Sequence, residues 1–175
     1  YQATEDMDFL SYHGAELLLD IAQFWSTIAT LNQEIGRYEI LHVVGPDEYH
    51  TEYPGSTEIG LNNNAYTNVL AVWVIQRAIE LKEVIDNSRY NELLTKLCIT
   101  SDDLTRWKDI SKRMYVPFLE DNKIIAQFDG YDKLQEFDWE KYRAIHGEAM
   151  RLDRILESEG ENVNKYKASK QADVL

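Results

Sequence analysis

Apolar residues recur at intervals of three and four positions near the start of the chain. Between His13 and Leu31 these positions are Leu17, Ile21, Phe24, Trp25, Ile28 and Leu31. This spacing places them on one helical face, because an α-helix completes a turn every 3.6 residues. The pattern predicts a short helix or turn over residues 4–12 and a long helix over residues 13–31 that packs this face into the core. Asn32 and Gly36 supply its stop signal.

A second apolar segment extends from Asn64 to Ile85. One broad face of the predicted helix carries Val69, Val72, Trp73, Gln76, Ile79 and Leu81, and the other side carries Ala71, Val74, Ile75 and Ala78. Asn64 is expected to cap the helix. A helix that is apolar nearly all round is typically buried on several sides.

The rest of the chain predicts shorter elements. Helices are expected over residues 88–99 and 102–114, the second capped by Thr100 or Ser101, and over 138–142 and 150–158. The β-like run 123–128 before Asp129-Gly130 is one arm of a possible hairpin. The last run, 166–175, ends without a cap signal, so we expect the chain to be cut inside an element. These elements indicate a mainly α chain; an α-solenoid interaction scaffold stays an alternative, although no fixed repeat is found.

Charge and composition narrow the classes of partner. The net charge of −13 argues against nucleic acid and anionic membranes, which repel an acidic protein. The longest strongly apolar run, 69–75, is far shorter than the roughly 20 residues of a membrane span. Cys98 has no second cysteine to pair with and is expected to be buried as a small hydrophobe. The four His are not spaced as metal ligands, so we expect no metal.

Proton-active side chains gather in the stretch from Tyr38 to Thr51. Alternation over residues 38–43 predicts a strand, and Gly45-Pro46 then turns the chain into a loop. Asp47, Glu48, Tyr49 and His50 follow in succession. Catalytic groups often lie on such loops. A polar turn with solvated charges is the alternative.

Three ordered motifs carry a family resemblance. They are Gly45-Pro46-Asp47-Glu48-Tyr49-His50, Asn63-Asn64-Ala65-Tyr66-Thr67-Asn68 and Lys170-Gln171-Ala172-Asp173-Val174. In this order they resemble glycoside hydrolase family 65, the maltose, trehalose and kojibiose phosphorylases and their hydrolase relatives. The resemblance implies that residues 1–175 form part of the central catalytic domain, an (α/α)₆ barrel. An N-terminal β-rich domain, the rest of the barrel and a C-terminal domain would lie outside this chain.

The resemblance also implies roles for individual residues. Glu48 matches the general acid of an enzyme that cleaves α-glucosidic bonds in disaccharides with inversion. To be protonated near neutral pH, Glu48 needs a raised pKa, which a desolvated pocket, Asp47 or an incoming phosphate could supply. Lys170 and Gln171 resemble the pair that binds the hydroxyls of the donated glucose. The other assigned positions are Tyr49, His50 and Thr51 on the leaving-sugar side, and Asp47 and Asn64 as structural residues near the site.

The sequence does not decide whether phosphate or water is the nucleophile. In a phosphorylase, inorganic phosphate attacks directly and is the co-substrate, and no other cofactor is expected. Hydrolase relatives use water and a carboxylate base downstream of Lys170-Gln171. We expect an α-linked disaccharide as the small-molecule partner and a cytoplasmic, homodimeric full-length enzyme. The loop over 51–62 is longer than expected for maltose phosphorylases, so the linkage stays open, and the 175 residues alone are predicted to be inactive.

Overall fold

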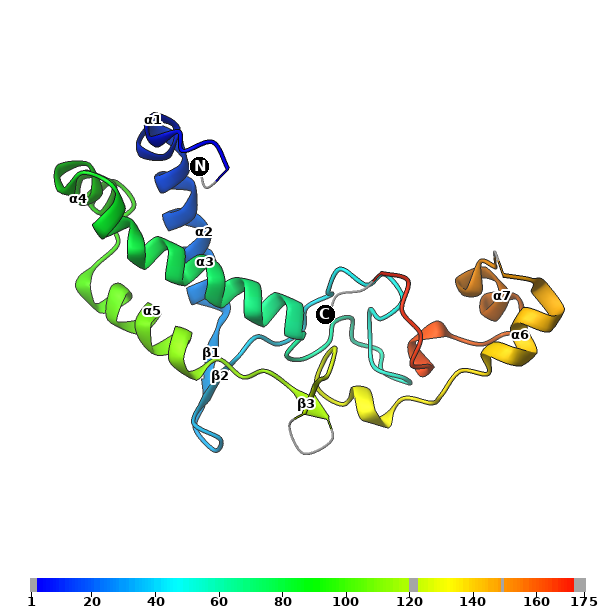
Figure 1. The fold of residues 1–175 in the computed structure, drawn as a ribbon. Helices are drawn as coiled ribbons and strands as arrows, with labels where there is room; N and C mark the ends of the chain where they lie inside the picture. Colours follow the sequence, from blue (N-terminus) through cyan, green and yellow to red (C-terminus); the bar gives the residue numbers. More distant parts are fainter. Residues whose placement is uncertain (1–2, 120–122, 149, 172–175) are drawn as a thin grey trace. The chain divides into compact units, whose positions relative to one another are not determined.

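The computed structural model describes residues 3–119, 123–148 and 150–171, and the chain divides into two compact units (Figure 1). The first unit contains the chain up to residue 39 together with 68–115. The second contains 40–67 and the chain from 116 onward.

Helices dominate the first unit. They are α1 (Met7–Phe9), a π-helix (Leu10–Gly14), α2 (Ala15–Ile28), most of α3 (Ala65–Val84), α4 (Asn87–Lys96) and α5 (Ser101–Arg113). Strands β1 (Thr30–Asn32) and β2 (Arg37–Glu39) form an antiparallel hairpin in which Leu31 lies opposite Tyr38. Gly36, at the turn, has φ +65°, a conformation that glycine adopts without strain.

The predicted end of the first long helix is wrong by three residues. Helix α2 ends at Ile28, Ala29 is extended, and Leu31 belongs to β1. The Arg106 guanidinium of α5 donates to the carbonyl groups of Ser26 (3.0 Å) and Ala29 (2.7 Å). The last carbonyl groups of a helix have no partner within it, so this distant arginine satisfies the helix end.

Two predicted helix starts are confirmed by their caps. Asn64 Oδ1 accepts a hydrogen bond from the Thr67 main-chain N–H at 2.9 Å, at the start of α3. Thr100 and Asp103 form a reciprocal capping box at the start of α5. Both signals depend only on neighbouring residues, which is why the sequence alone predicts them.

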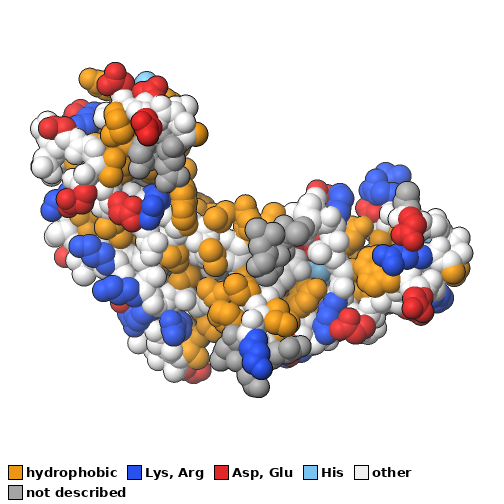
Figure 2. All heavy atoms as spheres, viewed as in Figure 1, with side chains coloured by type: hydrophobic (Ala, Val, Ile, Leu, Met, Phe, Trp, Pro, Cys, Tyr) orange, Lys and Arg blue, Asp and Glu red, His pale blue; other side chains and the backbone are white. Residues whose placement is uncertain are grey.

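The buried faces of the long helices differ from the predicted ones. Helix α2 buries Ala15, Leu19, Ala22 and Ser26, and α3 buries Ala71, Ile75, Ala78 and Leu81. Leu17 and Phe24, which we expected in the core, are 59% and 56% exposed, and Trp73 is 46% exposed. Figure 2 shows hydrophobic side chains at the surface along α3. Small side chains thus make up much of the packed face of these helices, together with Leu19, Ile75 and Leu81, while several other large apolar side chains stay outside.

The second unit consists of short elements around two apolar clusters. It contains β3 (Phe118–Leu119), β4 (Ile124–Ile125), α6 (Trp139–His146), α7 (Leu152–Ser158) and two 3₁₀ turns (Tyr131–Lys133 and Val163–Lys165). One cluster contains Phe137, Tyr142, Leu152, Leu156 and Ala168, and the other contains Leu61, Phe128 and Leu134. These clusters hold the loops that carry the candidate site.

Two strand predictions are only partly right. The run 123–128 contributes a hairpin strand, but only Ile124–Ile125 pair, with Phe118–Leu119 before them. Gly130 (φ +86°) begins a 3₁₀ turn instead of the hairpin loop. The strand expected over 38–43 stops at Glu39, because His42 has φ +57°, which no strand accommodates.

Cys98 is exposed, so its predicted burial is wrong. It follows the C-terminal end of α4 with φ +55°, a left-handed conformation that ends the helix and turns the side chain outward. Among the helices of the described residues, none has both the length and the apolar composition required to cross a bilayer.

Candidate active site

The loop that carries the proton-active residues lies tightly against residues 60–64. Val43 and Leu61 exchange main-chain hydrogen bonds of 3.0 and 2.8 Å. A Cβ at Gly45 would lie 2.3 Å from Asn64 Nδ2, and a Cβ at Gly60 would lie 2.6 Å from the His42 main chain. Both positions therefore require glycine, and this close packing fixes where the following carboxylates begin.

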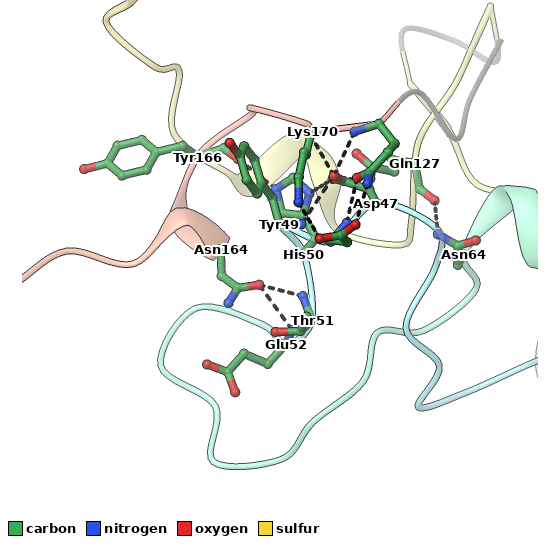
Figure 3. Close-up of polar contacts among 12 residues, drawn as sticks. Asp47, Tyr49, His50, Thr51, Glu52, Asn64, Gln127, Asn164, Tyr166 and Lys170 are labelled. Atoms are coloured by element: carbon green, nitrogen blue, oxygen red, sulfur yellow. Dashed lines mark hydrogen bonds and ion pairs between the residues drawn. The ribbon is translucent and has the colours of Figure 1, made fainter. Parts of the chain in front are cut away.

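Asp47 is buried and accepts hydrogen bonds from both sides of the site (Figure 3). Its Oδ2 lies 2.7 Å from His50 Nδ1 and 2.9 Å from Gln127 Nε2. Its Oδ1 accepts from the main-chain N–H groups of Lys170 (2.8 Å), Tyr49 (3.3 Å) and Gln171 (3.5 Å). Burial raises the pKa of Asp47, but these hydrogen bonds outweigh it and lower the pKa to about 2.

His50 is buried beside Asp47, and both of its ring nitrogens have partners. Nδ1 contacts the Asp47 carboxylate, and Nε2 lies 2.9 Å from the Tyr166 carbonyl oxygen. A carbonyl oxygen only accepts hydrogen bonds, so Nε2 carries a hydrogen in this arrangement. The ring packs against Phe128 at 5.3 Å between centroids. His50 therefore joins the acid loop to the segment that leads to Lys170.

Asn164 makes a second connection between the same two segments. Its Oδ1 accepts from the main-chain N–H groups of Thr51 (2.8 Å) and Glu52 (3.2 Å), and its Nδ2 donates to Asn162 at 2.9 Å. Asn164 is 5% exposed. The stretch 162–171 thus lies along the acid loop and is hydrogen-bonded to it at several positions (Figure 3).

Glu48 differs from its neighbour Asp47 because its side chain is exposed, by 61%. Lys170 Nζ donates to Oε2 at 2.5 Å, and Gln171 Nε2 donates to Oε1 at 2.6 Å. The Glu48 main-chain N–H also donates to Gln171 Oε1 at 3.2 Å. The structure therefore brings together the predicted general acid and the pair predicted to bind the donated glucose.

The pKa of Glu48 is lowered, not raised as we expected for a general acid. The hydrogen bond from Lys170 is the largest cause, followed by the bond from Gln171 and the positive charge of Lys170. Our expectation was wrong, because it did not include a cation placed directly on the carboxylate. Asp47, which we considered as a negative neighbour, is instead enclosed by its own donors.

The remaining predicted residues lie around this centre. Tyr49 is half-buried against the cluster of Phe137 and Leu156, and burial raises the pKa of its phenol. Asn64 is buried and, besides capping α3, donates from Nδ2 to the Gln127 carbonyl at 3.4 Å. Thr51 is half-buried. Ala172, Asp173 and Val174 of the third motif, and the chain end where we expected an interrupted element, lie outside the described residues.

Sequence reasoning missed two polar residues of the site. Gln127 lies in the β-like run 123–128, and Asn164 lies between the predicted helix 150–158 and the final run 166–175, where we predicted no element. Both are at least 94% buried, with 6% and 5% exposure. Their polarity within otherwise apolar surroundings is a weak signal, since many buried amides only satisfy main-chain groups.

A model of the "Glycosyl hydrolase family 65 central catalytic domain" matches residues 1–175. The chain belongs to glycosyl hydrolase family 65. The family resemblance predicted from the three motifs is thereby confirmed, and with it the fold class, a mainly α chain that forms part of an (α/α)₆ barrel.

Several proteins with known names resemble this chain. An uncharacterised glycosyl hydrolase of Mycobacterium tuberculosis is 50% identical over 175 residues, which is 100% of this chain and 13% of that protein. The kojibiose phosphorylase of Caldanaerobacter subterraneus is 37% identical over 81% of this chain and 18% of its own length. The trehalose 6-phosphate phosphorylase of Lactococcus lactis is 36% identical over 99% of this chain and 21% of its own length.

A solved structure supports the fold of this family 65 chain. It belongs to a provisionally named kojibiose phosphorylase from the human microbiome, with a TM-score of 0.71 and 24% identity, and the similarity covers 97% of this chain and 22% of that one. The chain spans 13% to 21% of the length of the curated relatives named above.

Proposed function

We propose that this chain supplies part of the active site of an enzyme that cleaves α-glucosidic bonds in disaccharides with inversion, and that Glu48 is its general acid. One observation carries the proposal. The exposed carboxylate of Glu48 faces the side chains of Lys170 and Gln171, although more than 120 residues separate them. Membership of family 65 supports the reaction class.

In the proposed reaction Glu48 gives its proton to the glycosidic oxygen while the bond from that oxygen to the anomeric carbon breaks. A phosphate oxygen attacks the anomeric carbon from the opposite face, which inverts the configuration and gives β-glucose 1-phosphate. The leaving sugar departs with the proton of Glu48. The Glu48 carboxylate takes up a proton from solvent before the next turnover. Phosphate is already anionic at neutral pH, so no protein base has to activate it.

Lys170 and Gln171 bind the hydroxyls of the donated glucose in this proposal. Their three ammonium hydrogens and their amide donor and acceptor suit neighbouring sugar hydroxyls. In the structure, the same donors bind Glu48. A sugar that takes over these donors releases the Glu48 carboxylate, and the departing cation raises the pKa of Glu48 toward that of a general acid.

The other residues take supporting roles. Tyr49 and Thr51 lie beside Glu48 in the chain and are proposed to line the leaving-sugar side. For His50 the proposal changes, because its two ring nitrogens are already engaged. We assign His50, with Asp47 and Asn64, to the support of the loop instead of to sugar binding.

Phosphorolysis is the first choice of nucleophile because several of the relatives that this chain resembles are named phosphorylases. Hydrolysis with a carboxylate base elsewhere in the enzyme is the second candidate. The relative at 50% identity, named a glycosyl hydrolase, favours keeping it. Residues 1–175 would then be the part of the central domain that carries the acid, with the nucleophile site contributed by other parts of the enzyme.

The test uses the full-length enzyme with kojibiose, trehalose, trehalose 6-phosphate and maltose, each with and without inorganic phosphate. Phosphate-dependent formation of β-glucose 1-phosphate is the expected result. Glucose release without phosphate supports the hydrolase instead. If no α-glucoside is cleaved and the chain stably captures a protein partner, both the phosphorylase and the hydrolase proposals are wrong. The interaction scaffold is then the function that remains.

A further inference from the structure

We propose that Asp47 is a positioning residue for the catalytic step, and that it acts as a hydrogen-bond acceptor that holds the Lys170-Gln171 main chain against the acid loop. The position of the Lys170 and Gln171 side chains over Glu48 then depends on Asp47. The proposal rests on the proposed function of Glu48, and it assigns the placement of the site to a residue that touches neither sugar nor phosphate.

The two oxygen atoms of Asp47 have separate tasks. Oδ1 accepts from three main-chain N–H groups, of Tyr49 on the acid loop and of Lys170 and Gln171 on the distant segment. Oδ2 lies against two side-chain nitrogen atoms, of His50 and Gln127. The Oδ2 contacts fix the plane of the carboxylate, and the fixed plane aims Oδ1 at the two segments it joins.

Burial strengthens the hydrogen bonds that Asp47 accepts from the two segments. Asp47 and His50 are each 1% exposed, and Gln127 is 6% exposed. Hydrogen bonds to an ionised acceptor are about twice as strong as neutral ones, and an unmet buried donor costs more than an exposed one. Loss of Asp47 leaves the N–H groups of Tyr49 and Lys170 without this acceptor, so residues 170 and 171 can move away from the acid loop even while Asn164 still holds residues 51 and 52.

An electrostatic effect on the acid is the competing role for Asp47. Its geometry argues against that role. The Asp47 side chain points into the protein, whereas the Glu48 side chain points to solvent. The negative charge of Asp47 is also met by its own donors.

The two roles predict different results for asparagine. In Asp47→Asn the retained Oδ1 still accepts from the Lys170 N–H. The new amide nitrogen can donate to His50 Nδ1, because the Tyr166 carbonyl already requires the hydrogen of His50 on Nε2. A rotated Gln127 amide can present its oxygen to the same group. Asp47→Asn therefore keeps the hydrogen bonds between the two segments and removes the negative charge, while Asp47→Ala removes both.

The experiment compares Asp47→Ala, Asp47→Asn and Lys170→Ala, with the double variants, in the full-length enzyme, by kcat and KM for the disaccharide. We expect Asp47→Ala to lower kcat/KM by about 100-fold, the loss typical of misplaced catalytic groups. We expect Asp47→Asn to recover most of that loss, to within about tenfold of the wild type. Lys170→Ala should cost much less in the Asp47→Ala background than in the wild type.

Asn164→Ala is the matched control. It cuts a different connection between the same segments and makes no hydrogen bond to Lys170 or Gln171, so Lys170→Ala should cost as much in this background as in the wild type. If Asp47→Asn is folded but as impaired as Asp47→Ala, the charge is what matters and the inference is wrong. If Asp47→Ala does not fold, the Asp47→Asn result still decides, because the inference requires a folded Asp47→Asn variant with kcat/KM within about tenfold of the wild type.

The proposed function fails separately from this inference. If Glu48→Gln keeps wild-type activity, Glu48 is not the general acid, whatever Asp47 does. If Glu48→Gln is inactive and the effects of Asp47→Ala and Lys170→Ala simply multiply, the acid is assigned correctly and only the positioning role of Asp47 is overturned.

Discussion

The Lys170 ammonium nitrogen lies 2.5 Å from Oε2 of Glu48, a residue 122 positions earlier in the chain. The pair is exposed, with side-chain exposures of 37% for Lys170 and 61% for Glu48. Exposed ion pairs contribute little to stability, typically below about 1 kcal/mol. The contact is therefore easily exchanged for another partner, which suits a pair whose two members both have to meet the substrate.

Replacing the proton-donating carboxyl group of Glu48 by an amide should nearly abolish turnover. Glu48→Gln keeps the size and shape of the side chain but cannot donate a catalytic proton, so kcat should fall by about 10² to 10⁴. Kinetics on a disaccharide, with circular dichroism to verify the fold, make the measurement. Glu58→Gln is the matched control, because Glu58 is an exposed glutamate of the following loop, and it should leave kcat unchanged. Near wild-type kcat in Glu48→Gln contradicts the assignment.

The pH dependence should respond to Lys170 in a defined direction. Lys170 lowers the pKa of Glu48 in the free enzyme, so Lys170→Met should move that pKa upward. The basic limb of kcat/KM reports loss of the proton from the free enzyme's acid and should move to higher pH. Lys167→Met, which removes a neighbouring lysine paired with Glu136, should leave the limb in place. An unmoved limb in Lys170→Met would show that the pair does not form in the enzyme.

Loss of the sugar-binding side chains should weaken both directions of the reaction. Lys170→Ala and Gln171→Ala should each lower catalytic efficiency by about 1 to 3 kcal/mol, the usual cost of a lost hydrogen bond to a buried or charged group. Kinetics of disaccharide cleavage and of synthesis from β-glucose 1-phosphate give the two values. If neither variant changes either direction, Lys170 and Gln171 are only surface residues.

The ionised form of Asp47 should stabilise the fold, and the effect should disappear in acid. Its pKa is about 2 in the folded chain against an ordinary 3.8, so the stabilisation is fully present above about pH 4 and is lost as the pH falls toward 2. The shift corresponds to roughly 2 kcal/mol. Urea unfolding of wild type and Asp47→Asn at pH 6, 4 and 3 measures it. A stability difference that grows as the pH falls would contradict the ionised state of Asp47.

The 175 residues expressed alone should be inactive and should self-associate. Val69, Leu70 and Trp73 of α3 are 46%, 40% and 46% exposed, which leaves an apolar surface on the isolated chain. Groups for the nucleophile are also expected outside it. Sedimentation and assays of phosphate uptake with maltose, trehalose and kojibiose test both points. A monodisperse monomer that turns over any of these sugars would contradict our placement of the barrel and its active site.

Local patterns predicted much of the fold. The starts of α3 and α5 depend on the side chains of Asn64 and Thr100, which bond to main-chain groups three residues away. The end of α2 was mispredicted because it depends on Arg106, 77 residues after Ala29. We expected α3 to be buried on several sides because both of its sides are apolar, but only one side is buried in this chain, and the sequence of the helix alone does not decide which side packs.

For the site, the motifs predicted Glu48, Lys170 and Gln171 but not how they meet. The roles of Gln127 and Asn164 were not predicted, because their partners lie 80 and 113 positions away in the sequence. An isolated glutamine or asparagine also forms no recognisable sequence pattern. The direction of the Glu48 pKa escaped for the same reason. It depends on where a distant lysine lies, which spacing along the chain does not encode.

The loop that follows Glu48 is held by hydrogen bonds and close packing at both of its ends. The Asn164 side chain accepts a hydrogen bond from the Thr51 N–H at 2.8 Å, and the Thr51 carbonyl accepts one from the Gly60 N–H at 2.7 Å. Gly60 in turn packs so closely against the His42 main chain that a Cβ at this position would lie 2.6 Å from it. Lengthening a loop between fixed ends costs little, about 0.6 kcal/mol for each doubling. Residues 54–58 can therefore diverge in length and composition while the acid keeps its register.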